Sequence, residues 1–329
     1  MKIKGVIMNK LKTIGISALA GSLAAFSAQA FEASVSGGAE ITISHQGGTD
    51  VTGNPLGARK NITISGSGEL DNGWGISVFH ALGDTHAYSS SVYSFDMGAM
   101  GTLSLDSGSA GHGAAGIDNI VPTAYEEADY GFTTGAADIG GTASGEYIGY
   151  SNTIGGATIL AAFNPDRGGA TQGDGGSVEG SGAAWDIGVK FAPVDGMLLV
   201  AGWGQLENGT AGTADVDEDT IGVTYAMGAV TVGAQLSHND VNGGTENTTT
   251  ALGITFNVSD NLSVGYQRLY DEYNVTAAGG DVETTFNGLS AAYSMGNIGI
   301  KFVANDVSNL GVTQGSSDEM KALSISFAF

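Results

Sequence analysis

The sequence predicts an all-β protein, a 16-stranded antiparallel transmembrane β-barrel that follows a short leader. Apolar and polar residues alternate in one segment after another, and the connections between the segments alternate between short and long. No uninterrupted apolar stretch of about 18 residues, which would indicate a spanning helix, occurs after the leader. Spanning strands need only about 9–11 residues and alternate in polarity, so this pattern predicts a barrel.

The first 30 residues have the features of a secretory signal peptide. Four lysines lie between Lys2 and Lys12, an apolar run extends from Ile14 to Phe26, and Ala28-Gln29-Ala30 is a small-residue cleavage pattern. The apolar run is shorter than the roughly 20 residues that a membrane anchor needs. We therefore expect residues 1–30 to be removed and residues 31–329 to form the barrel domain.

The composition excludes several classes of function. The chain has 11 Lys and Arg residues against 34 Asp and Glu residues, a formal net charge of −23. Such a surface repels nucleic acid and attracts cations. Because the sequence is 42% hydrophobic and only 14% charged, it is not typical of a disordered chain. The absence of cysteine excludes disulfides, a thiolate nucleophile and cysteine metal sites.

Alternation with a period of two is the main evidence for strands. In Arg59–Leu70 the even positions from Ile62 onward are apolar or small and the odd positions are polar or charged, and Trp185–Phe191 and Leu323–Phe329 alternate in the same way. One face of each strand would therefore contact lipid and the other would face the lumen. Sixteen such segments start near residues 34, 59, 74, 88, 101, 146, 157, 184, 197, 220, 230, 249, 262, 284, 297 and 320.

The connections between these segments alternate in length. Seven short ones fall at 71–73, 97–100, 152–156, 193–196, 227–229, 259–261 and 294–297. Eight long ones fall near 45–58, 83–87, 107–145, 164–183, 206–219, 239–248, 271–283 and 305–319. Short turns at one end and long loops at the other are typical of outer-membrane barrels. We expect both chain termini at the short-turn, periplasmic end.

A short repeat marks three of the short turns. Phe95–Met100, Tyr225–Val230 and Tyr293–Ile298 share the order aromatic, any residue, Met, Gly, any residue, apolar. Glycine tolerates the positive φ of a tight hairpin. The aromatic residue is expected at the height of the membrane interface.

Soluble β folds are the alternative to a membrane barrel. A calcium-binding β-roll needs tandem G-G-x-G-x-D repeats, and the sequence has none in series. A soluble sandwich or β-helix would also alternate in polarity. It would not predict alternating loop lengths, aromatic short turns and an aromatic C-terminus together.

The signal peptide, the sixteen segments, the terminal strand Leu323–Phe329 and the long third connection together resemble the general bacterial porins. The resemblance implies a trimeric diffusion channel in the outer membrane of a Gram-negative bacterium. It also implies that the third loop, residues 107–145, folds into the lumen and forms a constriction. In that family a terminal aromatic residue acts as an insertion signal, and Phe329 matches it.

The resemblance also implies that acidic residues of the third loop face basic residues of the barrel wall. The chain departs from the family in having few basic residues in the barrel, so the constriction should be net negative. By alternation, Arg268 falls on the apolar face. The expected acidic side of the constriction consists of Asp106, Asp118, Glu126, Glu127 and Asp129, and the expected basic wall consists of Arg59, Lys190 and Lys301.

The resulting hypothesis is a cation-preferring pore for passive diffusion of small hydrophilic solutes and ions. Its expected partners are outer-membrane lipid, lipopolysaccharide and two further copies of the chain, with no nucleic acid. A non-channel barrel with a structural or adhesive role is the alternative. An enzyme is not expected, because the five histidines are scattered and no catalytic motif occurs.

No cofactor is expected, with one reservation about calcium. The acidic runs Asp217-Glu218-Asp219 and Asp271-Glu272 fall in connections that are expected to be long. Carboxylate oxygens are the ligands that Ca²⁺ prefers. Calcium binding at these loops is therefore a second hypothesis, and solvated surface charge is its alternative.

Overall fold

The computed structural model describes residues 32–48, 53–85, 87–107, 111–132, 146–166, 182–208, 215–241, 245–275 and 282–329. The expected signal peptide lies outside the described residues. Within the described ranges, no helix is long and apolar enough to span a membrane.

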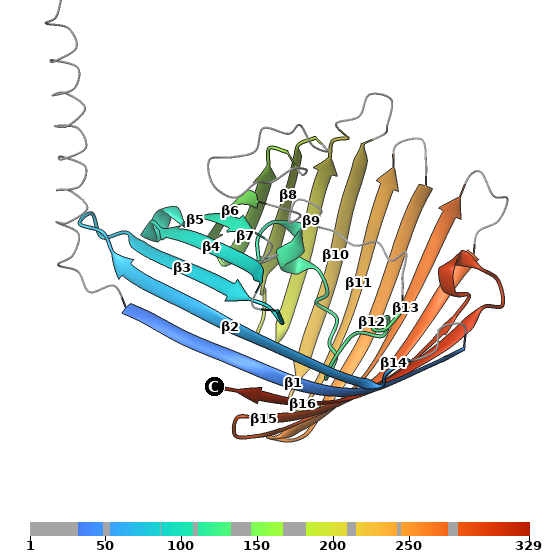
Figure 1. The fold of residues 1–329 in the computed structure, drawn as a ribbon. Coiled ribbons are helices and arrows are strands. Elements are labelled where there is room, and N and C mark those ends of the chain that lie inside the picture. Colours follow the sequence, from blue (N-terminus) through green and yellow to red (C-terminus); the bar gives the residue numbers. More distant parts are fainter. Residues whose placement is uncertain are drawn as a thin grey trace, which may run out of the picture.

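Sixteen strands make up nearly all of the described chain and close into an antiparallel barrel (Figure 1). Each strand pairs with its neighbours in the sequence, and β1 pairs with β16, so no edge is left unpaired. Closure is required in lipid, where an unpaired N–H or C=O group costs several kcal/mol. The strands are β1 (Glu32–Gly48), β2 (Leu56–Glu69), β3 (Gly75–Leu82), β4 (Tyr88–Asp96), β5 (Thr102–Ser107), β6 (Glu146–Ile154), β7 (Ala157–Asn164), β8 (Ala184–Phe191), β9 (Met197–Leu206), β10 (Val216–Met227), β11 (Val230–Val241), β12 (Thr245–Ser259), β13 (Leu262–Val275), β14 (Val282–Met295), β15 (Ile298–Ser308) and β16 (Ser317–Ala328).

The predicted fold class is confirmed, but five of the predicted long connections are too long. Strand β10 begins at Val216 where 220 was expected, and β12 begins at Thr245 where 249 was expected. Near these ends polar residues occupy both faces, so the alternation disappears, whereas the pairing continues, as between Asp240 and Glu246. The corrected connections span 49–55, 207–215, 242–244, 276–281 and 309–316.

The repeat at the short turns has the predicted backbone. Gly98, Gly228 and Gly296 have φ values of 64°, 62° and 60°, in the left-handed region that favours glycine. The aromatic residues that begin the three repeats are all exposed side chains. These residues are Phe95, Tyr225 and Tyr293.

The two faces of the barrel differ as the alternation predicts. The outer surface carries a band of exposed large apolar side chains, which includes Leu236, Leu252 and Leu323. Their neighbours in sequence point inward and are buried there against other groups, as Gln235 and Ser324 show. An apolar exterior and a polar interior are what a barrel with an aqueous lumen requires.

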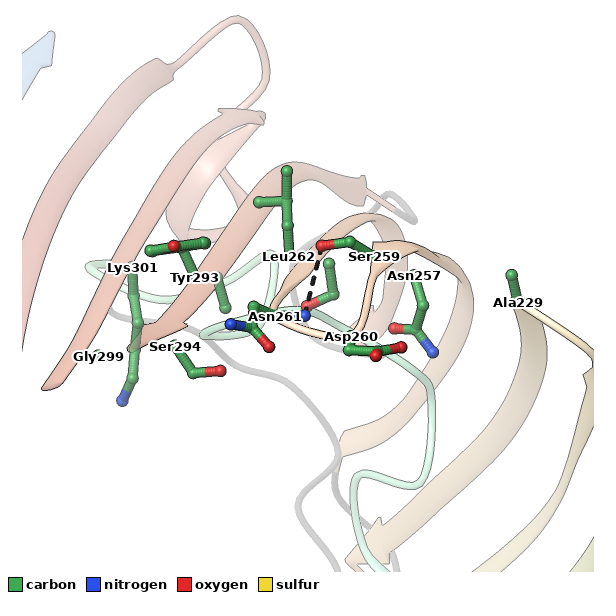
Figure 2. Close-up of a pocket in the computed structure, with 12 residues that line it drawn as sticks. Ala229, Asn257, Ser259, Asp260, Asn261, Leu262, Tyr293, Ser294, Gly299 and Lys301 are labelled. Atoms are coloured by element: carbon green, nitrogen blue, oxygen red, sulfur yellow. Dashed lines mark hydrogen bonds between the residues drawn. The ribbon is translucent and has the colours of Figure 1, made fainter. Parts of the chain in front are cut away.

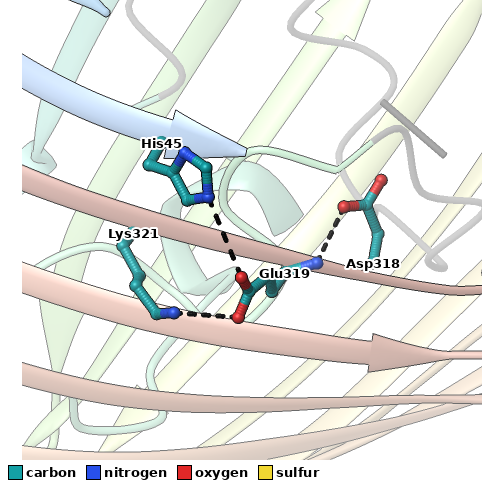
Figure 3. A network of polar contacts seen from close by, with 4 residues as sticks. All are labelled: His45, Asp318, Glu319 and Lys321. Atoms are coloured by element: carbon teal, nitrogen blue, oxygen red, sulfur yellow. Dashed lines mark hydrogen bonds and ion pairs between the residues drawn. The ribbon is translucent and has the colours of Figure 1, made fainter. Parts of the chain in front are cut away.

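The barrel closes at the seam between β1 and β16, whose register runs from Gly38 opposite Ala328 to Gly48 opposite Asp318. Beyond β16, Phe329 exchanges two backbone hydrogen bonds with Gly37, of 2.9 and 3.0 Å. On the outer side of the seam, Glu319 accepts a hydrogen bond from Lys321 at 2.8 Å and lies 3.9 Å from the His45 ring (Figure 3). All three side chains are exposed, so solvent screens this ion pair and it adds little to the stability of the seam.

Candidate channel constriction

Residues 111–132, which belong to the predicted third loop, run along the inside of the barrel (Figure 1). Backbone groups of this segment are hydrogen-bonded by inward-facing side chains of strands that are far apart in the sequence. We call residues 111–132 the inner segment. Its described bonds are Ala114 N–H to Asp186 Oδ1, Ile120 N–H to Gln235 Oε1, Gln235 Nε2 to the Ile117 carbonyl, Ala124 N–H to Ser290 Oγ, Ala128 N–H to Gln267 Oε1, Asn305 Nδ2 to the Glu127 and Tyr130 carbonyls, and Gln46 Nε2 to the Gly131 carbonyl.

The bounds of the predicted loop change slightly. Ser107 is the last residue of β5 rather than the first residue of the loop. Residues 108–110 and 133–145 lie outside the described residues. The inner segment is therefore the part of the expected constriction loop that the structure describes.

The inner segment is attached to β5 by a buried polar pair. His112 Nδ1 lies 3.2 Å from Asp106 Oδ2, and the His112 ring meets the buried Tyr147 ring edge-on. Asp106 is 0% exposed, so its carboxylate contacts the chain rather than water in the lumen. Asp106 therefore holds the start of the inner segment and is not one of the carboxylates at the surface of the constriction.

Apolar side chains on the inner face of the wall lie under the inner segment. Ile117 packs on Leu160 and Val200, and Ala128 packs on Leu269 and Phe286. Farther along, Tyr125, Tyr130 and Phe132 cover Val303, Met320 and Ala322. These wall residues break the polar pattern of the lumen face, and the inner segment shields them from water, which is the favourable arrangement for apolar surface.

Glu40 on β1 is a wall residue that binds the inner segment close to the β1–β16 seam. Its Oε1 accepts a hydrogen bond from the Tyr125 hydroxyl at 3.0 Å and a second one from the Ser324 hydroxyl. The charges of Lys301 and Arg59 both act on the Glu40 carboxylate. Lys301 also lies over the Tyr125 ring, with Nζ 5.0 Å from the ring centroid.

Burial raises the pKa of the Tyr125 phenol above its usual range, and the charges of Glu40 and Glu126 act in the same direction. Burial likewise raises the pKa of Tyr130, again with help from Glu126. Both phenols therefore stay protonated at neutral pH. Tyr125 can then serve as a hydrogen-bond donor to Glu40 under ordinary conditions.

The remaining predicted acidic residues lie on the inner segment and are all partly exposed. A hollow of about 370 Å³ is lined by residues 123–127 together with Asp129 and Tyr130. Glu126, Glu127 and Asp129 therefore surround one water-accessible space. Asp118 lies earlier, directly after the short 3₁₀ helix Ala114–Ile117.

The predicted basic wall is only partly gathered at this point. Arg59 on β2 is the Cα partner of Glu40, and Lys301 on β15 approaches Glu40 from the other side of the seam. Lys190 lies on β8, half of the barrel away in the strand order. Arg268 projects outward, as predicted, with its guanidinium 4.5 Å from the Tyr270 ring centroid.

Lys301 also borders a second hollow, at the end of the barrel where the short turns lie (Figure 2). This hollow has a volume of about 510 Å³. The β12–β13 turn contributes Asp260 and Asn261 to its lining, and the β14–β15 hairpin contributes Tyr293 and Ser294. Lys301 therefore has charged and polar neighbours both at the constriction and at this mouth.

Sequence reasoning missed Glu40, Tyr125 and Ser324 as members of this site. Glu40 lies on the polar face of the first segment, and Ser324 on the polar face of the last, so both positions were visible as lumen-facing. Their meeting depends on the register of the β1–β16 seam, which alternation alone does not specify.

The acidic runs proposed for calcium lie in strands rather than loops. Asp217–Asp219 is part of β10 and Asp271-Glu272 is part of β13, because both strands continue past their apolar stretches. Successive side chains of a strand point to opposite faces, so neither run can chelate an ion with adjacent carboxylates. Within the residues that the structure describes, no group of three His, Cys, Asp or Glu side chains is arranged to hold a metal ion.

Comparison with known proteins identifies the family. A family model for Gram-negative porins matches residues 15–309. The chain is a Gram-negative porin. It is an outer-membrane channel protein rather than an enzyme. The sequence has no significant match among curated proteins.

Solved porin structures share the fold of this porin at low sequence identity. The anion-selective porin of Comamonas acidovorans is 17% identical with a TM-score of 0.67, and the match covers 91% of this chain and 100% of that chain. OmpF of Salmonella typhi, in complex with daunomycin, is 11% identical with a TM-score of 0.67, and the match covers 91% and 98%. The trimer form of OmpT of Vibrio cholerae is 12% identical with a TM-score of 0.64, and the match covers 91% and 100%.

Proposed function

We propose that this porin is a passive, cation-preferring diffusion channel for small hydrophilic solutes and ions. The observation that carries the proposal is the charge around the inner segment. Glu126, Glu127 and Asp129 border one hollow of the segment, and Glu40 faces the segment from the wall. Arg59 and Lys301 are the basic wall residues at this place.

The proposed mechanism needs no binding cycle. A barrel of about 16 strands is wide enough to leave an aqueous channel, whereas about eight strands are filled by their own side chains. Solutes would be selected by size at the inner segment, and the charged side chains there would set the ion preference. A net negative constriction raises the local concentration of cations and lowers that of anions.

Reversal potentials in a KCl gradient across a planar bilayer test this proposal. The native protein is expected to give the sign of a K⁺-preferring pore. A Glu126→Gln and Glu127→Gln double variant should weaken the cation preference and shift the reversal potential toward zero. An Arg59→Gln and Lys301→Met double variant should strengthen the preference and shift the potential away from zero. Anion selectivity of the native protein would contradict the cation preference, and the absence of conductance would favour the non-channel alternative.

We further propose that this porin assembles as a homotrimer surrounded by outer-membrane lipid and lipopolysaccharide. The outward face of β1 and β2 carries the small residues Ala39, Ala58 and Gly66, at positions that alternate with inward ones. Small residues let two surfaces approach closely. This face is therefore the proposed contact between subunits.

Two further proposals concern the ends of the chain. Residues 1–30 would direct secretion and be cleaved, which the mass of the purified protein tests. Phe329 would act as the insertion signal of the barrel.

A further inference from the structure

Eight inward-facing glycines of the wall lie directly under the inner segment. They occupy β6 and each strand from β8 to β14, so they form a nearly continuous row around the inside of the barrel. We call this row the glycine track. Its members are Gly149, Gly188, Gly202, Gly222, Gly233, Gly253, Gly265 and Gly288.

At Gly188, Gly253 and Gly288, the backbone of the inner segment lies too close to the wall for any side chain. A Cβ atom at Gly188 would lie 2.6 Å from the Gly113 carbonyl oxygen, and one at Gly253 would lie 2.6 Å from the Pro122 carbonyl oxygen. At Gly288 it would lie 2.8 Å from the Ala128 Cα. Backbone atoms cannot move aside as a flexible side chain can. A glycine within a strand often marks such a close approach of another backbone.

The polar side chains that bind the inner segment alternate with the track. Gln235 is the Cα partner of Gly222, Gln267 is the partner of both Gly253 and Gly288, and Asn305 is the partner of Gly288 on its other side. Each of these side chains bonds a backbone group of the inner segment. The wall thus combines close contact with hydrogen bonding at neighbouring positions.

We infer that the glycine track consists of positioning residues, which seat the inner segment against the wall and thereby set the cross-section of the pore. The inner segment would then stay in place and would not open or close the pore. Displacing it would expose the apolar wall residues beneath it and leave its buried backbone groups without hydrogen-bond partners. The inference rests on the proposed channel function, since it assigns the track a role in conductance.

Gly233 offers the sharpest test, because its nearest contact is a single ring. A Cβ at Gly233 would lie 2.5 Å from Pro122 Cδ. In the Gly233→Ala variant the inner segment should be pushed into the lumen, which lowers the single-channel conductance and increases the open-channel noise. Adding Pro122→Ala removes the ring and should restore both quantities toward the native values.

Gly75→Ala is the matched control, at an inward-facing glycine of β3 whose nearest contact would be an ordinary 3.4 Å to Asp96 Cβ. Its conductance should equal that of the native channel. If Gly233→Ala gives no folded barrel, Gly222→Ala repeats the test. Its nearest contact would be the flexible end of the Ile120 side chain at 2.8 Å, which Ile120→Ala removes.

Two results would overturn the inference. One is a Gly233→Ala channel with native conductance and noise. The other is a loss of conductance in Gly233→Ala that the added Pro122→Ala substitution does not reverse. Failure of the channel function itself would look different, because the native protein would then show no conductance in the same bilayer.

Discussion

Single residues at the β1–β16 seam connect the wall of the barrel to the inner segment. Glu40 accepts a hydrogen bond from the Tyr125 hydroxyl, and the Ser324 hydroxyl donates to the same carboxylate oxygen. By alternation, both positions lie on the polar, lumen-facing side of their strands. Alternation did not predict their partners, because Tyr125 comes from a segment without periodicity and reaches Glu40 only in the closed barrel.

The raised pKa of Tyr125 leads to a prediction about alkaline stability. An unfolded tyrosine ionises near pH 10, whereas folded Tyr125 keeps its proton to a higher pH. The unfolded state therefore loses protons first, and the free energy of unfolding should fall as the pH rises above about 10. Tyr125→Phe should make this fall shallower in urea titrations at pH 9 to 11, about one unit on either side of that ordinary value.

The slope of stability against pH is compared between the native protein and the Tyr125→Phe variant over this range. An equal slope in the native protein and the Tyr125→Phe variant would show that Tyr125 does not contribute to alkaline unfolding.

At the scale of elements, the membrane-spanning parts of the strands were predicted within a few residues. The strand ends at the long connections were not. Strand β10 shows why: Ile221, Val223 and Tyr225 alternate with small or polar residues, but Asp217, Glu218 and Asp219 carry no period. Backbone hydrogen bonds with β9 and β11 extend the strand through these residues all the same. The alternation of side chains depends on whether each face of the strand contacts lipid or water. Backbone pairing depends instead on the neighbouring strand.

The last strand gives a prediction at this scale. The Phe329 side chain is 73% exposed, but its ring covers Gly37 of the neighbouring strand, where an added Cβ would lie 2.7 Å from it. Aromatic side chains can cover a strand glycine in this way. Phe329→Ala should lower the free energy of unfolding of refolded protein by about 0.2–1 kcal/mol, the range of cross-strand pairs.

The comparison with assembly in cells separates this contact from the proposed insertion signal. Ile325→Ala on the same strand serves as the control, because it changes an outward side chain away from the terminus. If Phe329→Ala lowers the yield in the outer membrane but leaves the stability of the refolded barrel unchanged, the ring acts in insertion alone and the seam contact adds nothing.

For the whole molecule, the surface of the barrel indicates how copies of the chain meet. The outward face of β1 and β2 includes several glycines and alanines between its large apolar side chains, such as Ile41 and Ile64. Ala39→Trp should therefore weaken the proposed trimer and shift the mass measured by light scattering in detergent toward the monomer.

Ala234→Trp is the matched control, on the outward face of β11 across the barrel. It should keep the native mass, because a tryptophan there would contact lipid alone. A native protein that is monomeric in detergent and in membranes, as shown by cross-linking, would contradict the trimer.

The sequence by itself determined the fold class, the sixteen strands, and the faces that meet lipid and water. These follow from local physics, because the environment on each side of a strand selects the side chains one position at a time. Only the tertiary structure decided that Asp106 is buried, that Lys190 lies apart from Arg59 and Lys301, and that a row of glycines underlies the inner segment. These features depend on closure and register, which bring residues together that are far apart in the chain.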